Sequence, residues 1–302
     1  LIVFFMLGES LLALFQYLNQ GSVGLSILGE PVLSPDIPGL AKIFLADELF
    51  LRPYGTFPHP NLLGEYFVFS LLFLGFFWKK DPVVYSVFAF LLGLGLIFTF
   101  SRVAWLSLAV SSVFFLFLRG KKISVRTFFL TASLFLLFFV AFNLGDVFLE
   151  RFHTNISGAF FSRFESIASS LQLLREHPFG VGAGMSALSL QEFSFLKLMP
   201  WEYQPPYNLF LVVANELGIQ GLLLFVVAFF FLGRWIFLER KKHPYFFSFY
   251  AALFIISLFD HAFFTLFAGQ ALFVLLLVFG EEALSHSYAE KRIPSQGTFI
   301  SA

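Results

Sequence analysis

The chain has 302 residues, of which 58% are hydrophobic and 13% charged, and a mean hydropathy of +0.84, which excludes an ordinary soluble globular protein. Its formal net charge of zero excludes a bulk attraction to nucleic acid, and the absence of Cys excludes disulfides, thiolate metal sites and cysteine nucleophiles. Apolar stretches of about 20 residues predict an all-α fold, a polytopic transmembrane helical bundle.

Charged residues divide the hydrophobic sequence into about eight predicted spans. The first begins at Leu1, with no Met and no basic segment before it. We therefore expect the later part of a longer protein, or one that lacks its first spans. The sixth span is too long for one helix, and glycines at 218 and 221 predict a break within it. The spans are placed near 1–18, 62–78, 82–100, 103–118, 126–144, 208–238, 244–260 and 263–280.

The distribution of basic residues predicts the orientation of these spans. Arg102 is the only charge between residues 82 and 118. One helix over this run would be about 55 Å long, against a hydrocarbon core of about 30 Å. If two spans instead turn near Arg102, all basic clusters fall on the cytoplasmic side. Arg102 is then expected near the outer face, at the tip of a helical hairpin.

This orientation divides the chain into four parts. The largest polar part contains an amphipathic helix predicted at 162–176, which His177-Pro178 ends. The parts are membrane helices over 1–144 with an external loop near 19–61, a large periplasmic loop over 145–207, membrane helices over 208–280, and a cytoplasmic tail over 281–302.

Arginines on the outer side are the first candidates for a site. A charge at membrane depth costs at least a few kcal/mol, so Arg102 is expected to be paired, to face a cavity or to act on a ligand. The alternative is a side chain that only reaches to the interface. Guanidinium groups match phosphate oxygens, so Arg102 with Arg52, Arg163 or Arg175 in one cavity predicts a diphosphate site. Alternatively, the loop arginines are solvated or paired with acids such as Glu165.

Histidines supply the candidate bases. A lone His is more often structural than catalytic, but an external base would come from this set. Asp260 precedes one of them and could orient its imidazole or bind Arg102. Their spacing fits no zinc motif, so we expect no metal and no cofactor. The histidines near the outer side are His59, His153, His177 and His261.

Two further features are assigned structural roles. The glycine-rich segment 180–184 follows a Pro rather than a strand, which favours a close backbone approach over a nucleotide-binding loop. Glu9 and Glu216 lie at or near membrane depth, and Glu9 is interpreted as a hydrogen-bond partner between helices.

Five short motifs are spread over most of the chain. They are Arg52-Pro-Tyr-Gly-Thr-Phe-Pro-His-Pro-Asn61; Thr99-Phe-Ser-Arg102 with Ala104-Trp105; Arg163 followed by His177-Pro178-Phe-Gly-Val-Gly182; Asn208-Leu-Phe-Leu with Glu216-Leu-Gly-Ile-Gln-Gly221; and Phe259-Asp-His261 with Gly269-Gln270. In this order, on alternating spans, they resemble the O-antigen ligase/polymerase family of bacterial envelope proteins.

The resemblance implies a multi-pass enzyme of the bacterial inner membrane whose active face is periplasmic. Such enzymes transfer a glycan, without a metal, from a polyprenyl diphosphate carrier to lipid A-core, to another glycan or, in relatives, to protein. The positions that it implies as catalytic are Arg102, Arg163, Tyr207, His177 and His261. Those that it implies as substrate-binding are Arg52, His59, Asn61, Arg175, Asn208 and Asp260.

One position departs from the family pattern. Where ligases carry a His before the Asn, proposed to activate the acceptor hydroxyl, this chain has Tyr207. A phenol with a pKa near 10 is a poor base at neutral pH. Either His177 or His261 replaces it, the leaving group suffices, another acceptor is used, or the protein is inactive. The alternatives in function are an O-antigen polymerase and a flippase for lipid-linked glycans, which would carry charges on both sides of the midplane.

Overall fold

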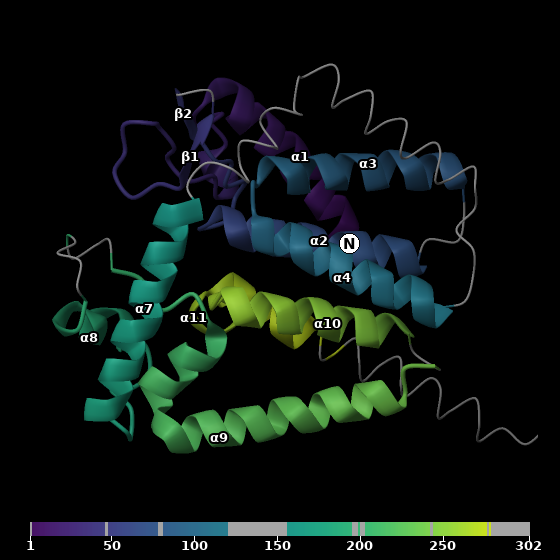
Figure 1. The fold of residues 1–302 in the computed structure, drawn as a ribbon. Helices are drawn as coiled ribbons and strands as arrows, with labels where there is room; N and C mark the ends of the chain where they lie inside the picture. Colours follow the sequence, from purple (N-terminus) through teal and green to yellow (C-terminus); the bar gives the residue numbers. More distant parts are fainter. Residues whose placement is uncertain are drawn as a thin grey trace, which may run out of the picture.

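The computed structural model describes residues 2–45, 48–77, 81–119, 156–194, 199, 203–241, 244–276 and 278. This part of the chain is mostly helical, as predicted, and Figure 1 shows its long helices lying side by side. The elements are α1 (Ile2–Asn19), η1 (Ser26–Leu28), β1 (Lys42–Leu45), β2 (Glu48–Leu51), α2 (Pro60–Phe77), α3 (Pro82–Phe98), α4 (Arg102–Arg119), α7 (Ile156–Glu176), α8 (Ser186–Ser189), η2 (Leu190–Glu192), α9 (Leu209–Leu238), α10 (Pro244–Phe259) and α11 (Ala262–Thr265).

The hydrophobic core surrounds α2. This helix contacts α1, α3, α4 and α10, while α10 also packs along α4 and α9. Phe67 and Phe69 of α2 are fully buried, and the Phe67 ring lies against the backbone of α3 at Gly95, where a side chain would clash with it. Close packing through a small residue is typical of helices that meet in a membrane.

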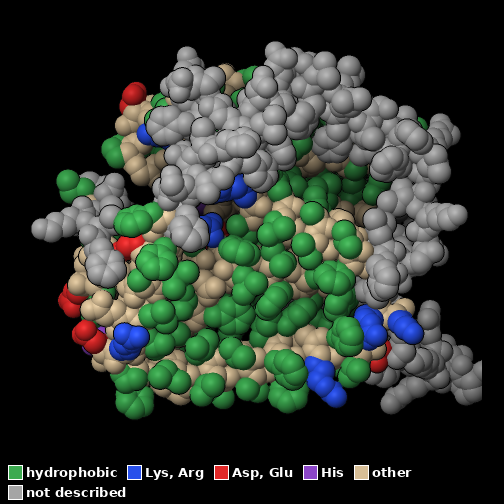
Figure 2. All heavy atoms as spheres, in the orientation of Figure 1, with side chains coloured by type: hydrophobic (Ala, Val, Ile, Leu, Met, Phe, Trp, Pro, Cys, Tyr) green, Lys and Arg blue, Asp and Glu red, His purple; other side chains and the backbone are tan. Residues whose placement is uncertain are grey.

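Two helices in the described part are long and apolar enough to cross a membrane, α1 and α9, and several shorter apolar helices accompany them. The α9 face exposes Leu223, Leu224, Phe230 and Phe231. Figure 2 shows hydrophobic side chains over much of the lower half of this face, with several basic ones at the end where α9 finishes. Such a surface suits contact with lipid. The eight spans and the four-part division stay predictions, and the predicted span 126–144 and tail 281–302 lie outside the described residues.

The predicted turn at Arg102 is confirmed. Helix α3 ends at Phe98 and α4 begins at Arg102, with Phe100 in the left-handed region at a φ of 51°. The Thr99 hydroxyl donates to the Leu96 carbonyl at 2.6 Å and closes the end of α3. The two helices then diverge instead of packing as a tight hairpin, because α3 packs on α1 and α2 whereas α4 packs on α10.

The segment between α1 and α2 is held by polar side chains of α1. The Gln16 Oε1 atom accepts hydrogen bonds from the Tyr54 and Gly55 backbone N–H groups at 3.0 and 2.8 Å. Glu9 accepts from both the backbone N–H and the hydroxyl of Thr56, at 2.9 and 2.6 Å. The interpretation of Glu9 as a partner between helices is therefore wrong, since its carboxylate orders a loop.

The predicted break in α9 and the predicted close approach of the glycine segment are one feature. Gly218 has a φ of 73° and a ψ of −174° inside α9. The carbonyls of Asn215 and Glu216, released by this break, accept the N–H groups of Val181 and Gly182 at 2.9 and 3.0 Å. The break thus fixes the chain that follows α7 against α9.

Candidate functional site

A cavity of about 300 Å³ lies where the turn before α4, the middle of α7 and the segments before α2 and α9 meet. Arg52, Arg102 and Arg163 all line it, together with Lys42. None of the described residues that line it is Asp or Glu. Three of the candidate arginines thus share one cavity, which is electropositive. Its lining comprises Gly39, Ala41, Lys42, Arg52, His59, Asn61, Phe100, Ser101, Arg102, Val103, Arg163, Gln204 and Tyr207.

Arg52 is a buried connector between three segments. Its Nε donates to the Thr99 carbonyl at 2.8 Å, and its Nη2 donates to Asn61 Oδ1 at 2.7 Å. Only 7% of the residue is exposed. Arg52 therefore joins the end of β2 to the α3–α4 turn and to the start of α2.

Arg102 is half-buried at a position that disfavours a cation. It is the first residue of α4, where the helix dipole places partial positive charge. Its guanidinium also experiences repulsion from Arg163 across the cavity. Because arginine cannot neutralise itself by losing a proton, an anion between the two side chains would relieve both penalties.

Arg163 reaches the cavity from α7. Its guanidinium carbon lies 5.4 Å from the Tyr207 ring centre and 5.9 Å from that of Phe259. One Nη atom approaches the Phe259 carbonyl at 3.5 Å. These contacts connect α7 to the segment before α9 and to the end of α10, and they position the guanidinium by stacking on the two rings.

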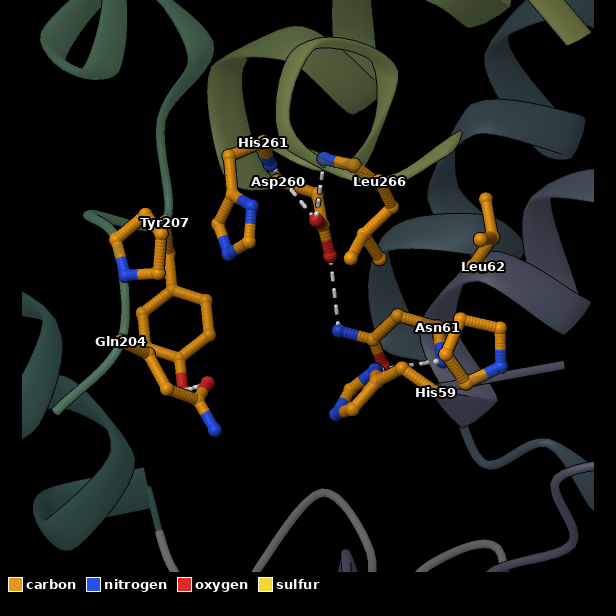
Figure 3. A pocket seen from close by; sticks show the side chains of 11 residues that line it. His59, Asn61, Leu62, Gln204, Tyr207, Asp260, His261 and Leu266 are labelled. Carbon is orange, nitrogen blue, oxygen red and sulfur yellow. Dashed lines mark hydrogen bonds between the residues drawn. The ribbon is translucent and has the colours of Figure 1, made fainter. Parts of the chain in front are cut away.

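A second cavity of about 230 Å³ adjoins the first. The two share His59, Asn61, Gln204 and Tyr207. Figure 3 shows Tyr207 and Gln204 on one side of it, His59 and Asn61 on the other, and Asp260 with His261 between them. Its remaining lining is largely apolar: Pro58, Leu62, Pro205, Ala262 and Leu266.

Asp260 fixes the relation between the α10–α11 turn and α2. Its Oδ1 accepts the backbone N–H groups of His261 and Ala262 at 2.7 and 3.1 Å. Its Oδ2 accepts from Asn61 Nδ2 at 3.0 Å. The suggestion that Asp260 orients the imidazole or binds Arg102 is replaced by this capping role, because its oxygens are taken by backbone and amide donors.

His59 is neutral at physiological pH. Burial lowers its pKa to about 4, with repulsion from Arg52 adding to the effect and Asp260 opposing it. Its Nδ1 atom accepts the Asn61 backbone N–H at 3.1 Å, so its proton is carried on Nε2. His59 can therefore donate a hydrogen bond into the cavity but is a poor proton acceptor.

Residues 87–226 match the model of a protein family described as O-antigen ligase. Over this range the chain is similar to the O-antigen ligase family. The matched range contains Arg102, Arg163 and Tyr207. No curated protein matches the chain. This similarity supports a membrane-associated, glycosyltransferase-like protein of surface polysaccharide assembly.

Tyr207 occupies the position where the ligase resemblance leads one to expect His. Its hydroxyl donates to Gln204 Oε1 at 3.0 Å, and burial, aided by Asp260, raises its pKa against the opposing effect of Arg163. The phenol is thus further from acting as a base than a free tyrosine. The Tyr207 side chain lines both cavities and stacks on Arg163.

Three predicted site residues have other surroundings. Arg175 and His177 are exposed at the end of α7 and line neither cavity. Asn208 caps α9, since its Oδ1 accepts the Leu211 N–H at 3.0 Å and its Nδ2 donates to the Leu258 carbonyl at 3.0 Å. These three residues therefore lie outside the lining of the two cavities.

Gln204 and Lys42 are among the lining residues that were not predicted from the sequence. Gln204 lies on the wall shared by both cavities, and Lys42 lies in the electropositive one. Gln204 stands in the Gln-Pro-Pro-Tyr run directly before the Asn208 cap, a signal that could have identified it. Lys42 had no such signal, because it reaches the cavity only through the β1–β2 hairpin, in which Ile43 pairs with Phe50.

Proposed function

We propose that this protein transfers a glycan from a polyprenyl diphosphate carrier to a carbohydrate acceptor, such as lipid A-core, at the periplasmic face of the bacterial inner membrane. The observation that supports it is the meeting of Arg102 and Arg163 in a cavity whose described lining contains no acid. A diphosphate supplies the anionic oxygens that this arrangement lacks.

In this proposal the arginines act on the leaving group. As the glycosidic bond to the phosphate breaks, negative charge grows on the diphosphate oxygen. Guanidinium groups already held at that place stabilise the charge without reorganisation, an effect worth roughly 10²–10³ in rate for each donor. Arg52 holds the cavity wall through Thr99 and Asn61, and His59 offers its Nε2–H to the substrate.

The test is transfer by purified protein in nanodiscs, with a polyprenyl diphosphate glycan as donor and lipid A-core as acceptor. Arg102→Ala and Arg163→Ala should each lower kcat by about 10²-fold or more and weaken binding of polyprenyl diphosphate. Arg102→Lys should fall between wild type and Arg102→Ala, because Lys keeps the charge but not the fork of donors.

Arg240→Ala is the matched control. This arginine stacks on Phe237 at the opposite end of α9, 3.8 Å from its ring centre, and its loss should leave transfer unchanged. Full activity in both cavity variants would refute the proposal. Activity should survive EDTA, since the charge stabilisation is assigned to arginines.

Product length decides between the two activities of the family. A ligase attaches the whole glycan to lipid A-core, whereas a polymerase lengthens the lipid-linked glycan and leaves one repeat unit when it is inactivated. Movement of the intact lipid-linked glycan between leaflets, without bond formation, would indicate a flippase.

A further inference from the structure

The proposed transfer requires a group that takes the proton from the acceptor hydroxyl. Tyr207 is unsuited, because its hydroxyl is engaged with Gln204 and its pKa is raised by burial. His59 is also unsuited, because its Nδ1 lone pair is occupied by the Asn61 N–H. Of the titratable residues that line the second cavity, His261 has not yet been assigned a role.

The hydrogen bonds of Thr265 define the state of the His261 ring. The Thr265 hydroxyl donates to the His261 carbonyl at 3.2 Å, which commits its only proton. The same oxygen lies 2.6 Å from His261 Nδ1 and therefore accepts from it. With the hydroxyl proton on the carbonyl, we assign the proton of the neutral imidazole to Nδ1, which leaves the electron pair of Nε2 unshared.

We infer that His261 is the general base of this protein, and that the second cavity binds the carbohydrate acceptor whose hydroxyl it deprotonates. This inference rests on the proposed transferase function. His261 carries the free lone pair of a base and lines the cavity that adjoins the electropositive one, and Tyr207, Gln204, His59 and Asn61 line both. The donor phosphates and the base thus lie on opposite sides of the place where the new bond forms.

The composition of the second cavity suits a sugar. Aromatic and proline faces at Tyr207, Pro58 and Pro205 can cover the apolar face of a pyranose ring. The amides of Gln204 and Asn61 offer hydrogen-bond groups for its hydroxyls. This cavity contains no Lys or Arg in its described lining, so its acceptor is expected to be recognised through a neutral sugar unit rather than through a phosphate.

The step balances without a co-reactant. The acceptor oxygen forms a bond to the anomeric carbon of the donor while its proton passes to His261 Nε2. The bond from the anomeric carbon to the phosphate oxygen breaks, and its electron pair leaves with the polyprenyl diphosphate, whose charge Arg102 and Arg163 stabilise. The imidazolium then releases its proton to solvent.

The surroundings of His261 keep it unprotonated at neutral pH. Burial lowers its pKa below 6.5, and Asp260 and Glu216 oppose the shift. The other titratable groups that face it are Tyr207, whose ring centre lies 6.2 Å away, and the neutral His59. The rate should therefore be constant around pH 7 and fall only at acidic pH, as the base becomes protonated.

Four variants test the assignment in the nanodisc assay. His261→Gln should lower kcat by about 10²–10⁴-fold, remove the acidic limb of the pH profile and leave polyprenyl diphosphate binding intact. Tyr207→Phe should lower kcat far less, because the phenol is not the base. Thr265→Val should reduce kcat and alter the acidic limb, since the ring loses its fixed tautomer, and Thr265→Ser should restore both.

The outcomes separate this inference from the proposed function. If His261→Gln retains kcat and the wild-type pH profile while the Arg102 and Arg163 variants are inactive, the transferase proposal stands and the base assignment is wrong. A larger loss in Tyr207→Phe than in His261→Gln would overturn it as well. If wild-type protein neither binds polyprenyl diphosphate nor forms product, the function itself is refuted.

Discussion

The loss of stability expected from a substitution at Gly218 can be worked out from the contact between segment 180–184 and the break in α9. Gly218 has a φ of 73° and a ψ of −174°, a region essentially reserved for glycine. A Cβ there would lie 2.6 Å from Phe179 Cα and from the Pro178 carbonyl oxygen, roughly 0.8 Å inside the 3.4 Å at which ordinary contact begins. Both obstacles are backbone close to the Pro178 ring, so they cannot rotate away.

Gly218→Ala should therefore be strongly destabilising. The backbone conformation alone costs about 1–3 kcal/mol for a residue with a side chain, and the clash adds to this. A total of about 3 kcal/mol or more corresponds to a fall in the unfolding temperature of about 6–12 °C. Because the contact also holds the chain after α7, transfer activity should decline as Arg163 loses its position.

Gly184→Ala separates conformational strain from the clash. Gly184 has a φ of 77°, but a Cβ there would meet nothing within 4 Å. Its substitution should cost only about 1–2 kcal/mol, the penalty of the left-handed conformation. Thermal unfolding of the two variants in one detergent measures both losses of stability. Equal unfolding temperatures for the two variants would refute the role assigned to the backbone contact.

Three other substitutions have definite expected outcomes. Gln16→Leu removes three buried hydrogen bonds to the backbone of residues 54–55 and should lower stability by roughly 3 kcal/mol, measured by thermal unfolding. Asn61→Asp places a carboxylate against Asp260 in place of an amide donor. It should unfold at lower temperature at pH 7, with the deficit shrinking as pH falls and one carboxyl is protonated. Glu65→Leu should stabilise by about 1–3 kcal/mol, because both buried Glu65 oxygens lack a hydrogen-bond partner among the described residues; a lower melting temperature would contradict this.

Charge and periodicity predicted the local features of the fold, namely helices and the turns or breaks between them. The turn at Arg102 followed from the length of the apolar run and the placement of basic clusters, and the structure confirms two helices there. The helix predicted at 162–176 lies within α7, and the glycines of the long sixth span do mark a break. The sequence does not predict which helices pack against each other. The apolar side chains of α3 and α4 could pack equally well against several other apolar helices. The divergence of these two helices therefore appears only in three dimensions.

Helix geometry, which can be worked out from the sequence, also explains where some of the candidate site residues lie. Arg163 and Arg175 are 12 residues apart on α7, which places them about 120° apart around the helix and about 18 Å apart along it. That arithmetic alone argues against both entering one cavity, and only Arg163 does so. Asn208 precedes a helix, where Asn most often serves as a cap, and it does so here. Both placements follow from helix geometry, which short sequence motifs do not encode.

Arg102 is a single charge in a long apolar sequence, yet its electrostatic environment depends on residues far away in the chain. Arg52 has carbonyl and amide acceptors within the protein, so its charge is already partly satisfied. Arg102 instead stands at the positive end of α4 and faces Arg163, and both contacts raise the free energy of the empty cavity. A diphosphate converts these two penalties into attractions, and the growth of charge during bond cleavage strengthens them further. The arrangement that is unfavourable without substrate is therefore the one that favours the leaving group in the transition state.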